Sequence, residues 1–388
     1  MKANIHIHIG PGHHEKTVLD QFKRYFDSVS HSNYYPYYLF ESNNRIQSSF
    51  RYDSFLKLAW FILNKLNIRK NRIIDFTYPL YDSETSKRID NVDLLYCWPQ
   101  VSKKTIEKVR EQGGKTLLDY PIPHITTWQN VLLEEKDKTG IIPHSLFSKK
   151  MVDRMLNEID SADFITTPSQ FVRESFSENG VVSDRLLLNR YGIEIELFDK
   201  IKLKGKNSSK LKVIFVGSVE LRKGVHYLLR AFRELDPNVF ELKIIGTVTN
   251  DMMIWMEKNY SPLSNISFLG QMEKSKVLVE IIGADVMVMP SLLEGLSLTI
   301  LESMAAGTPV ISSTNAGGLG LIEDSEDGFI IPIRDVNSII EKLTWCAGNQ
   351  DRLIKMGYKA NQKVTESNNA VEYGNRLLES VRSILTVK

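Results

Sequence analysis

The stretch of residues 285–312 constrains the fold of this chain more than any other part of it. It begins with a short run of β-branched residues and methionines, 285–290, the composition of a strand buried on both faces of a parallel sheet. A polar loop and a helical pattern ending at Gly307 follow, and a second buried strand begins at Pro309. The stretch therefore predicts a strand, loop, helix and strand unit of an α/β protein.

Two glutamates lie in this unit, Glu294 in the loop and Glu302 within the helix. Eight residues of helix rise about 12 Å, so the pair cannot share a proton as a close acid–base dyad. They can instead hold the two ends of one elongated ligand. Free backbone amides and the dipole at the start of the helix favour an anion, usually a phosphate, and Gly295 would let it approach the backbone closely. The residues that supply these amides are Gly295, Leu296, Ser297 and Leu298.

The pattern Glu294-x7-Glu302, within EGLSLTILESMAAGTPVI, resembles the donor-sugar motif of the retaining GT-B glycosyltransferases of the family 4 type. The resemblance implies that Glu294 lies at the transferred sugar and that Glu302 binds the nucleotide ribose. The alternative is that Glu294 is a solvated loop residue and Glu302 a surface residue of the helix. Gly295, the AAGTPVI continuation and the preceding buried strand favour the resemblance.

A second motif follows the apolar strand pattern of residues 211–216. Arg222 and Lys223 would lie at the carboxyl end of that strand, where a forked guanidinium and an ammonium can balance a diphosphate. Taken alone, such a pair is usually solvated at the surface. Together with the glycine that follows, however, four residues resemble the family's diphosphate-binding loop: Gly217, Ser218, Arg222 and Lys223.

The first half of the chain alternates strand and helix patterns, which indicates a doubly wound sheet. The expected strands are 3–9, 34–40, 72–76, 93–98 and 115–119, and the expected helices are 15–26, 51–72 and 103–111. The resemblance implies that the turn containing Gly12 faces the donor phosphates and the acceptor. His124 follows the 115–119 strand, where ligands bind in such sheets. Family 4 enzymes commonly carry a histidine there, near the reactive end of the sugar, although a single histidine is more often structural.

The length and composition set the broader limits. A chain of 388 residues is too long for one ordinary core and predicts two domains. Its net charge of +2 argues against non-specific binding to nucleic acid. Cys97 and Cys346 lie far apart, without metal spacing or a disulfide framework, as in a reducing cytosol. Because no signal-peptide pattern or apolar run of transmembrane length is present, the sequence predicts a cytoplasmic protein.

The polar stretch of residues 199–210, rich in lysine, glycine and serine, is the expected hinge between the two domains. The resemblance implies a GT-B fold, in which two Rossmann-like, doubly wound parallel-sheet domains face each other across a cleft. Residues 1–200 would form the acceptor-binding domain and residues 201–369 the nucleotide-sugar-binding domain. The last helix, about 370–388, would pack back on the first domain.

For function, the resemblance implies a retaining glycosyltransferase that uses a nucleoside-diphosphate sugar, with UDP favoured over GDP. The acceptor would be a hydroxyl of a saccharide or of a lipid-linked molecule, in surface polysaccharide or glycolipid assembly. Arg222, Lys223 and the amides after Glu294 would replace a divalent cation, so we expect no metal and no cofactor. His124 and Glu294 are the expected catalytic residues.

Three alternatives stay open. A nucleotide-sugar hydrolase or epimerase could use the same fold, and a non-catalytic subunit could bind the nucleotide sugar without turnover. The basic and aromatic pattern from Arg51 to Arg72 can lie on anionic lipid, which would fit a membrane-surface interaction protein. The same pattern also fits a helix packed on the sheet with a basic outer end.

Overall fold

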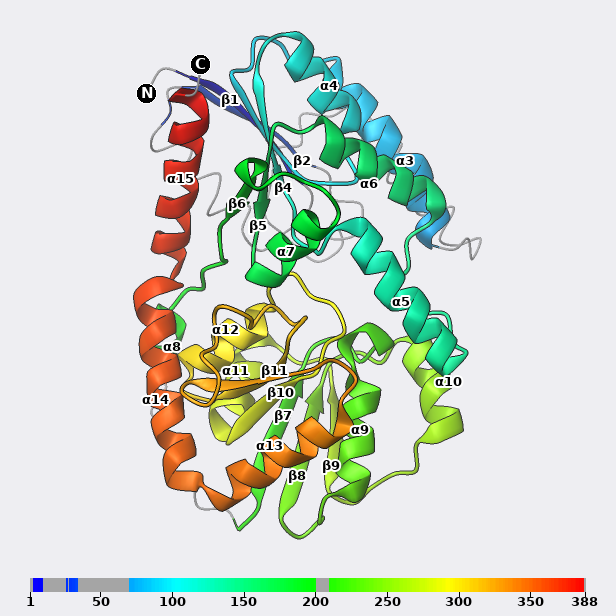
Figure 1. The fold of residues 1–388 in the computed structure, drawn as a ribbon, viewed down its shortest axis with the longest axis vertical. Helices are drawn as coiled ribbons and strands as arrows, with labels where there is room; N and C mark the ends of the chain where they lie inside the picture. Colours follow the sequence, from blue (N-terminus) through cyan, green and yellow to red (C-terminus); the bar gives the residue numbers. More distant parts are fainter. Residues whose placement is uncertain (1–2, 10–25, 27, 34–69, 200–208, 387–388) are drawn as a thin grey trace.

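The computed structural model describes residues 3–9, 26, 28–33, 70–199 and 209–386. Within these ranges the strands form two sheets of six strands each, and every pair of neighbouring strands is parallel. Helices cover both sheets, and the first sheet lies above the second in the view of Figure 1. The predicted α/β class, with two doubly wound parallel sheets, is confirmed.

The first sheet is built from the first half of the chain. Its strands are β1 (Asn4–Ile9), β2 (Ser28–Asn33), β3 (Leu94–Cys97), β4 (Lys115–Asp119), β5 (Phe164–Thr167) and β6 (Leu186–Leu188). The accompanying helices are α3 (Lys70–Ser86), α4 (Lys103–Glu111), α5 (Ile125–Thr139), α6 (Lys149–Ser161), α7 (Gln170–Glu178) and α8 (Glu196–Asp199). The strand order is β2-β1-β3-β4-β5-β6, so the direction of winding reverses between β1 and β3.

The second sheet follows the same plan. Its strands are β7 (Leu211–Val216), β8 (Phe240–Ile245), β9 (Ile266–Gly270), β10 (Val286–Met289), β11 (Val310–Ser313) and β12 (Gly328–Ile331). The helices are α9 (Val225–Glu234), α10 (Asn250–Asn259), α11 (Lys274–Gly283), α12 (Leu298–Ala305), α13 (Val336–Gly348), α14 (Gln350–Ser367) and α15 (Ala370–Thr386). In the order β12-β11-β10-β7-β8-β9, the winding reverses between β7 and β10.

The strand, loop, helix and strand unit of residues 285–312 lies at the centre of the second sheet. All four residues of β10 are fully buried between β7 and β11, as predicted from their apolar composition. The helix α12 ends before Gly307, whose φ of 69° is a conformation that side chains with a Cβ disfavour. This glycine lets the chain turn directly into β11.

One predicted strand is wrong. Residues 72–76 belong to the helix α3, not to a strand. The buried residues Thr77, Tyr81 and Thr85 recur every four positions, which is the spacing of one helical face. The short apolar run at the start of α3 resembled a strand because so few residues do not distinguish the two periods.

Several other predictions fall outside the described residues. They are the strand at 34–40, the helix at 15–26 apart from its last residue, the turn with Gly12, the pattern from Arg51 to Arg72 apart from its last three residues, and most of the hinge. No helix in the part of the chain that the structure describes is long and apolar enough to cross a bilayer.

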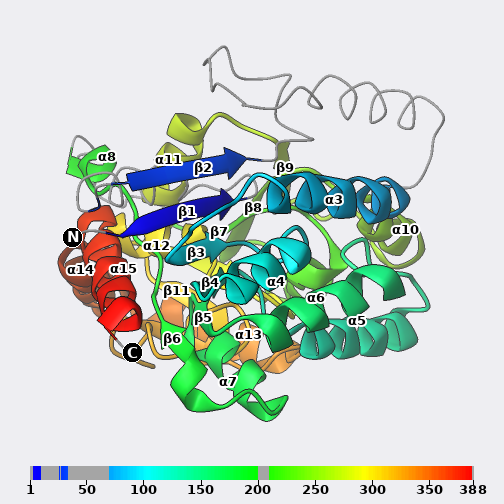
Figure 2. The same cartoon turned by 90° about the horizontal axis from the view of Figure 1, so that it is seen from above.

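The last two helices run along one edge of the molecule, from the second sheet to the first (Figures 1 and 2). The side chain of Tyr373 on α15 packs edge to face on Tyr191, with ring centroids 6.2 Å apart. Arg376, also on α15, donates a hydrogen bond of 2.8 Å to the carbonyl of Arg190. The C-terminal helix therefore stabilises the end of the first sheet.

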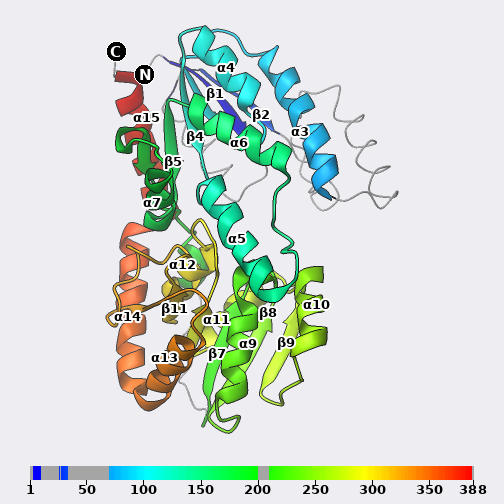
Figure 3. The same cartoon turned by 45° about the vertical axis from the view of Figure 1, so that its right-hand side comes forward.

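The helix α5 forms a second connection, because it descends from the first sheet to the helices of the second (Figure 3). Its fully buried Glu135 lies 2.7 Å from Nε2 of His226 and accepts hydrogen bonds from Tyr227, at 3.1 Å, and Arg334, at 2.8 Å. Burial raises the pKa of Glu135, but His226 and Arg334 outweigh it and leave the pKa below its usual value. The carboxylate is therefore ionised, and it fixes α5 to α9 and to the loop after β12.

We expect Glu135→Gln to lower the free energy of unfolding by about 2 kcal/mol, because an amide replaces a charged acceptor of three buried donors. Urea unfolding measures this loss. The neighbouring Glu134 also pairs with Arg334, at 3.1 Å, but its side chain is 53% exposed. Glu134→Gln should therefore change the stability by less than about 0.5 kcal/mol. Equal effects of the two variants would contradict the role given to Glu135.

Candidate active site

The loops that follow β7 and β10 meet at the carboxyl edge of the second sheet, where its winding reverses. Open α/β sheets bind ligands at such a point. Arg222 from the first loop lies 2.5 Å from Oε1 of Glu294 from the second, and Lys223 also forms an ion pair with Glu294. Arg222 donates a further bond of 2.6 Å to Glu220. We call these residues the Arg222 cluster: Glu220, Arg222, Lys223 and Glu294.

Two glycines place the cations of this cluster. Gly224 has a φ of 67°, and a Cβ there would lie 2.0 Å from the carbonyl oxygen of Pro290. Only glycine fits this close approach, which holds the loop after β7 against the end of β10. Gly217 has a φ of 150°, and a Cβ there would lie 3.7 Å from the Lys223 ammonium nitrogen. The Lys223 side chain thus lies over the backbone of the predicted diphosphate loop.

Side chains of the first half of the chain complete the cluster. The Ser145 hydroxyl donates to Glu220 at 2.6 Å and accepts from Nε of Arg222 at 3.3 Å. The Arg222 guanidinium lies over the Trp128 ring of α5, 5.3 Å from its centroid, a favourable cation–π geometry. Sequence reasoning missed Ser145 and Trp128, because nothing local marks them. It also missed Glu220, although an acidic residue two positions before an Arg-Lys pair indicates a possible ion-pair partner.

The charges of the cluster are balanced, because two glutamates face one arginine and one lysine. Burial raises the pKa of Glu220, but the Arg222 charge and the hydroxyls of Ser145 and Ser218 outweigh it and lower the pKa to about 2. Burial also raises the pKa of Glu294, and Arg222 and Lys223 more than offset it, so this pKa too lies below its usual value. Both glutamates are therefore ionised at neutral pH. A diphosphate that enters the cluster must displace a carboxylate from at least one cation.

Glu302 lies inside α12 and is only 8% exposed. It forms an ion pair of 3.1 Å with Lys274, the first residue of α11. Glu294 is also largely buried, with 13% of its side chain exposed. The alternative of two solvated surface glutamates is therefore wrong.

The start of α12 differs from the prediction in two respects. A Cβ on Gly295 would lie 1.8 Å from the carbonyl oxygen of Pro121, so the close approach at this glycine is made by the first half of the chain and not by a ligand. The amide of Ser297 donates to the carbonyl of Ala316 at 3.4 Å, so it is not a free donor. The predicted anion site can use the amides of Gly295, Leu296 and Leu298.

His124 is the N-cap residue of α5. Its Nδ1 accepts a hydrogen bond of 3.3 Å from the amide of Thr126, and its ring packs edge to face on Phe176. The residue is 4% exposed, and burial lowers its pKa to about 4. His124 is therefore neutral at physiological pH. Gly12, by contrast, lies outside the described residues.

We expect the stability to fall as the pH is lowered from about 6.5, the unfolded pKa of His124, towards its folded pKa near 4, because the unfolded state then binds more protons. His124→Asn keeps a capping oxygen but cannot be protonated. Between pH 7 and pH 5, the free energy of unfolding should therefore fall by roughly 1 to 3 kcal/mol less in this variant than in the wild type, as measured by urea unfolding. An unchanged pH dependence would show that the buried imidazole is not responsible.

The two doubly wound parallel sheets, with a charged site at the winding reversal of the second, define a GT-B fold. Residues 198–363, which include the Arg222 cluster and the whole of α12, match the family model described as Glycosyl transferases group 1.

The whole fold matches solved structures of low sequence identity. The structure of Anabaena HepE in complex with UDP has a TM-score of 0.65 at 13% identity, over 98% of this chain and 100% of that one. Sucrose-phosphate synthase from Thermosynechococcus elongatus has a TM-score of 0.65 at 16% identity, over 99% of this chain and 100% of that one. These structures support the fold.

Curated relatives match over a shorter part of the chain. The amylovoran biosynthesis glycosyltransferase AmsK of Erwinia amylovora is 28% identical over 207 residues, which cover 50% of this chain and 50% of AmsK. The chain spans about half the length of the curated relatives it matches.

Proposed function

We propose that this protein is a retaining glycosyltransferase that transfers a sugar from a nucleoside-diphosphate sugar to a hydroxyl of a saccharide or lipid-linked acceptor. The Arg222 cluster carries the proposal, because two adjacent cations at the winding reversal suit a departing diphosphate. The match to the Glycosyl transferases group 1 model supports the same assignment. UDP is the favoured nucleotide and GDP the next, and HepE has been solved with UDP. The name of AmsK supports a role in surface polysaccharide or glycolipid assembly.

In the proposed reaction, the bond between the anomeric carbon and the diphosphate oxygen breaks while the acceptor oxygen bonds to the same face of that carbon. The acceptor hydroxyl gives its proton to the departing phosphate. Arg222 and Lys223 stabilise the negative charge that develops on the diphosphate, together with the free amides at the start of α12. These groups supply the positive charge, so we propose that no divalent metal is needed.

The remaining residues position the donor. Glu294 leaves the cations when the diphosphate arrives, and its freed carboxylate accepts hydrogen bonds from the sugar. Glu302, held by Lys274, accepts from the ribose hydroxyls. Gly217 and Ser218 border the diphosphate through the backbone after β7. His124, neutral and buried, orients the loop between β4 and α5 beside the sugar.

The first experiment is the thermal shift of the purified chain with UDP, GDP, ADP and CMP, each with and without magnesium. A ligand at about a hundred times its dissociation constant stabilises the folded state by roughly 2.7 kcal/mol. We expect a rise with UDP that magnesium does not change and that Glu302→Ala removes. A rise only with magnesium would overturn metal independence, and no rise with any nucleotide would contradict the donor site.

Product analysis then tests the reaction. Incubation of the protein with UDP-sugars and saccharide acceptors should give a glycoside with the anomeric configuration of the donor, in the presence of a metal chelator. Release of free sugar at the same rate with and without acceptor would instead indicate a hydrolase. Nucleotide binding without any product would indicate a non-catalytic subunit.

A further inference from the structure

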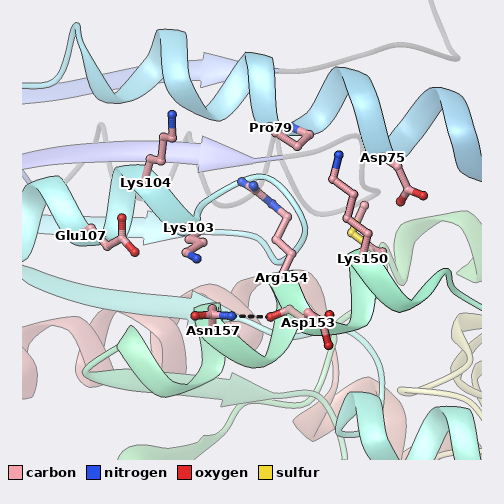
Figure 4. Close-up of a pocket in the computed structure, with 10 residues that line it drawn as sticks. Asp75, Pro79, Lys103, Lys104, Glu107, Lys150, Asp153, Arg154 and Asn157 are labelled. Carbon is pink, nitrogen blue, oxygen red and sulfur yellow. Dashed lines mark hydrogen bonds between the residues drawn. The ribbon is translucent and has the colours of Figure 1, made fainter.

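A cavity of about 450 Å³ opens among the helices of the first sheet, between α3, α4 and α6 (Figure 4). We call it the α3–α6 notch. Its volume lies within the range of small-molecule sites, roughly 300 to 1,000 Å³. Pro79 of α3 and Met151 of α6 supply apolar surface. Around them stand acids, bases and an amide: Asp75, Lys103, Lys150, Asp153, Arg154 and Asn157.

The arginine of the notch is fixed in place by groups beneath it. The Arg154 guanidinium forms ion pairs with Asp82 and Glu158, two side chains with no exposure, and donates to the carbonyl of Gln100 at 2.6 Å. Glu158 is itself held by the amides of Gln100, at 2.5 Å, and Ser102, at 2.8 Å. The guanidinium is thus oriented before any ligand arrives, which is a property of binding sites.

The other charges of the notch are less engaged. Within the described ranges, no carboxylate forms an ion pair with Lys103 or Lys150. Asp75 accepts a hydrogen bond of 2.7 Å from Ser148 and retains further acceptor capacity. Because acids face the same space as the lysines, the notch does not favour a polyphosphate or an anionic lipid surface. Alternating donors and acceptors over apolar surface suit a saccharide, whose hydroxyls both donate and accept.

A short segment links the notch to the Arg222 cluster. Ser145 contacts Glu220 and Arg222 in the cluster, while Ser148 caps α6 and binds Asp75 in the notch. Three residues of chain span at most about 11 Å. The notch also lies beside the start of α4, which follows β3 at the carboxyl edge of the first sheet, where ligands bind in such sheets. A short oligosaccharide in the notch could therefore extend to the donor.

We propose that the α3–α6 notch binds the non-reacting saccharide portion of the acceptor, one or two sugar units away from the hydroxyl that is glycosylated. This inference rests on the proposed function. Lys103 and Lys150 would donate to sugar oxygens, and Asp75 and Asp153 would accept from hydroxyls. Arg154 would donate through Nη1, the nitrogen that its contacts with Asp82, Glu158 and Gln100 do not use. Pro79, backed by the buried Met151, would contact the apolar face of a sugar ring.

The test is the rate at which single lysines are acetylated by acetic anhydride, read by peptide mass spectrometry. The probes are methyl glucoside, methyl galactoside, glucuronic acid and their short oligosaccharides, each at saturating UDP. We expect at least one probe to slow acetylation of Lys103 and Lys150 by about threefold or more, an occupancy of roughly two thirds. Lys108 on α4 and Lys149 on α6 do not line the notch and should keep their rates. Equal rates at all four lysines with every probe would overturn the proposal.

The same measurement separates this inference from the proposed function, because Lys223 reports on the Arg222 cluster independently. UDP alone should slow acetylation of Lys223 and leave Lys103 and Lys150 unchanged. If a saccharide protects the notch lysines while UDP does not protect Lys223, the saccharide site in the notch is supported and the donor site at the Arg222 cluster is contradicted. If UDP protects Lys223 and no saccharide protects the notch lysines, the donor site is supported and the saccharide site in the notch is contradicted.

A matched pair of variants completes the test in the transfer assay. Lys150→Gln should raise KM for the acceptor by about tenfold, with kcat and KM for the donor unchanged. Lys149→Gln changes the charge by the same amount one residue away and should leave all three constants unchanged. An equal rise in both variants would indicate a general charge effect and overturn the assignment of the notch.

Discussion

Arg222→Ala should lower kcat/KM for sugar transfer by about a hundred- to a thousandfold, because the diphosphate then leaves without its forked cation. Arg222 is the centre of the site, with contacts to Glu220, Glu294 and Ser145. Its removal leaves two ionised, largely buried glutamates with Lys223 as their remaining cation in the cluster. We therefore also expect a loss of about 3 kcal/mol in the free energy of unfolding. Steady-state kinetics and urea unfolding measure the two effects.

Two further variants keep this prediction testable. Arg222→Lys retains the charge and should fold like the wild type, but an ammonium cannot contact the departing diphosphate as a fork, so kcat/KM should fall about tenfold. Arg233→Ala, at an exposed position of α9, is the control and should leave activity and stability unchanged. If Arg222→Ala folded and transferred sugar at the wild-type rate, the phosphate role of the cluster would be disproved.

Glu294→Gln should separate binding from turnover. Glu294 competes with the diphosphate for Arg222 and Lys223, so its neutralisation should tighten UDP binding by roughly three- to tenfold. The same change removes the carboxylate that positions the sugar, so kcat should fall by about a hundredfold. Titration calorimetry with UDP and kinetics with the UDP-sugar measure the two opposite effects.

Glu302→Gln is the contrasting variant, because the second glutamate of the motif does not contact the cations of the Arg222 cluster. It should weaken UDP binding through the lost acceptor for the ribose. Opposite signs for UDP affinity in the two variants would distinguish their roles. A Glu294→Gln protein with full transfer activity would refute the role given to Glu294, and weaker UDP binding would refute its competition with the diphosphate.

Elements with a strong local pattern could be predicted from the sequence almost to the residue. The strands β4 and β7 and the helix α4 lie where the sequence pattern predicts them. The failure at residues 72–76 has a local cause too, since a run of a few apolar residues fits a strand and a helix equally. In the site, Arg222, Lys223, Glu294 and Glu302 stand in motifs that span only a few residues, so reading along the chain could find them.

The contacts among these residues were beyond the sequence. Arg222 and Glu294 are 72 residues apart in the chain, and Arg222 and Ser145 are 77 apart. Arg222 and Glu294 meet because β7 and β10 are neighbours at the winding reversal, and Ser145 reaches them because α5 packs on the helices of the second sheet. The order of strands in a sheet produces no periodic pattern in the sequence, so neither contact could be predicted from it. Burial is likewise a tertiary property, and it is burial that keeps the capping residue His124 neutral. The close packing of the Gly295 backbone against Pro121 also depends on how the two halves of the chain meet. The sequence by itself determined the elements and the chemical groups, since both depend on local spacing. Only the tertiary structure decided which groups meet and in which charge state, because long-range packing sets distance and solvation.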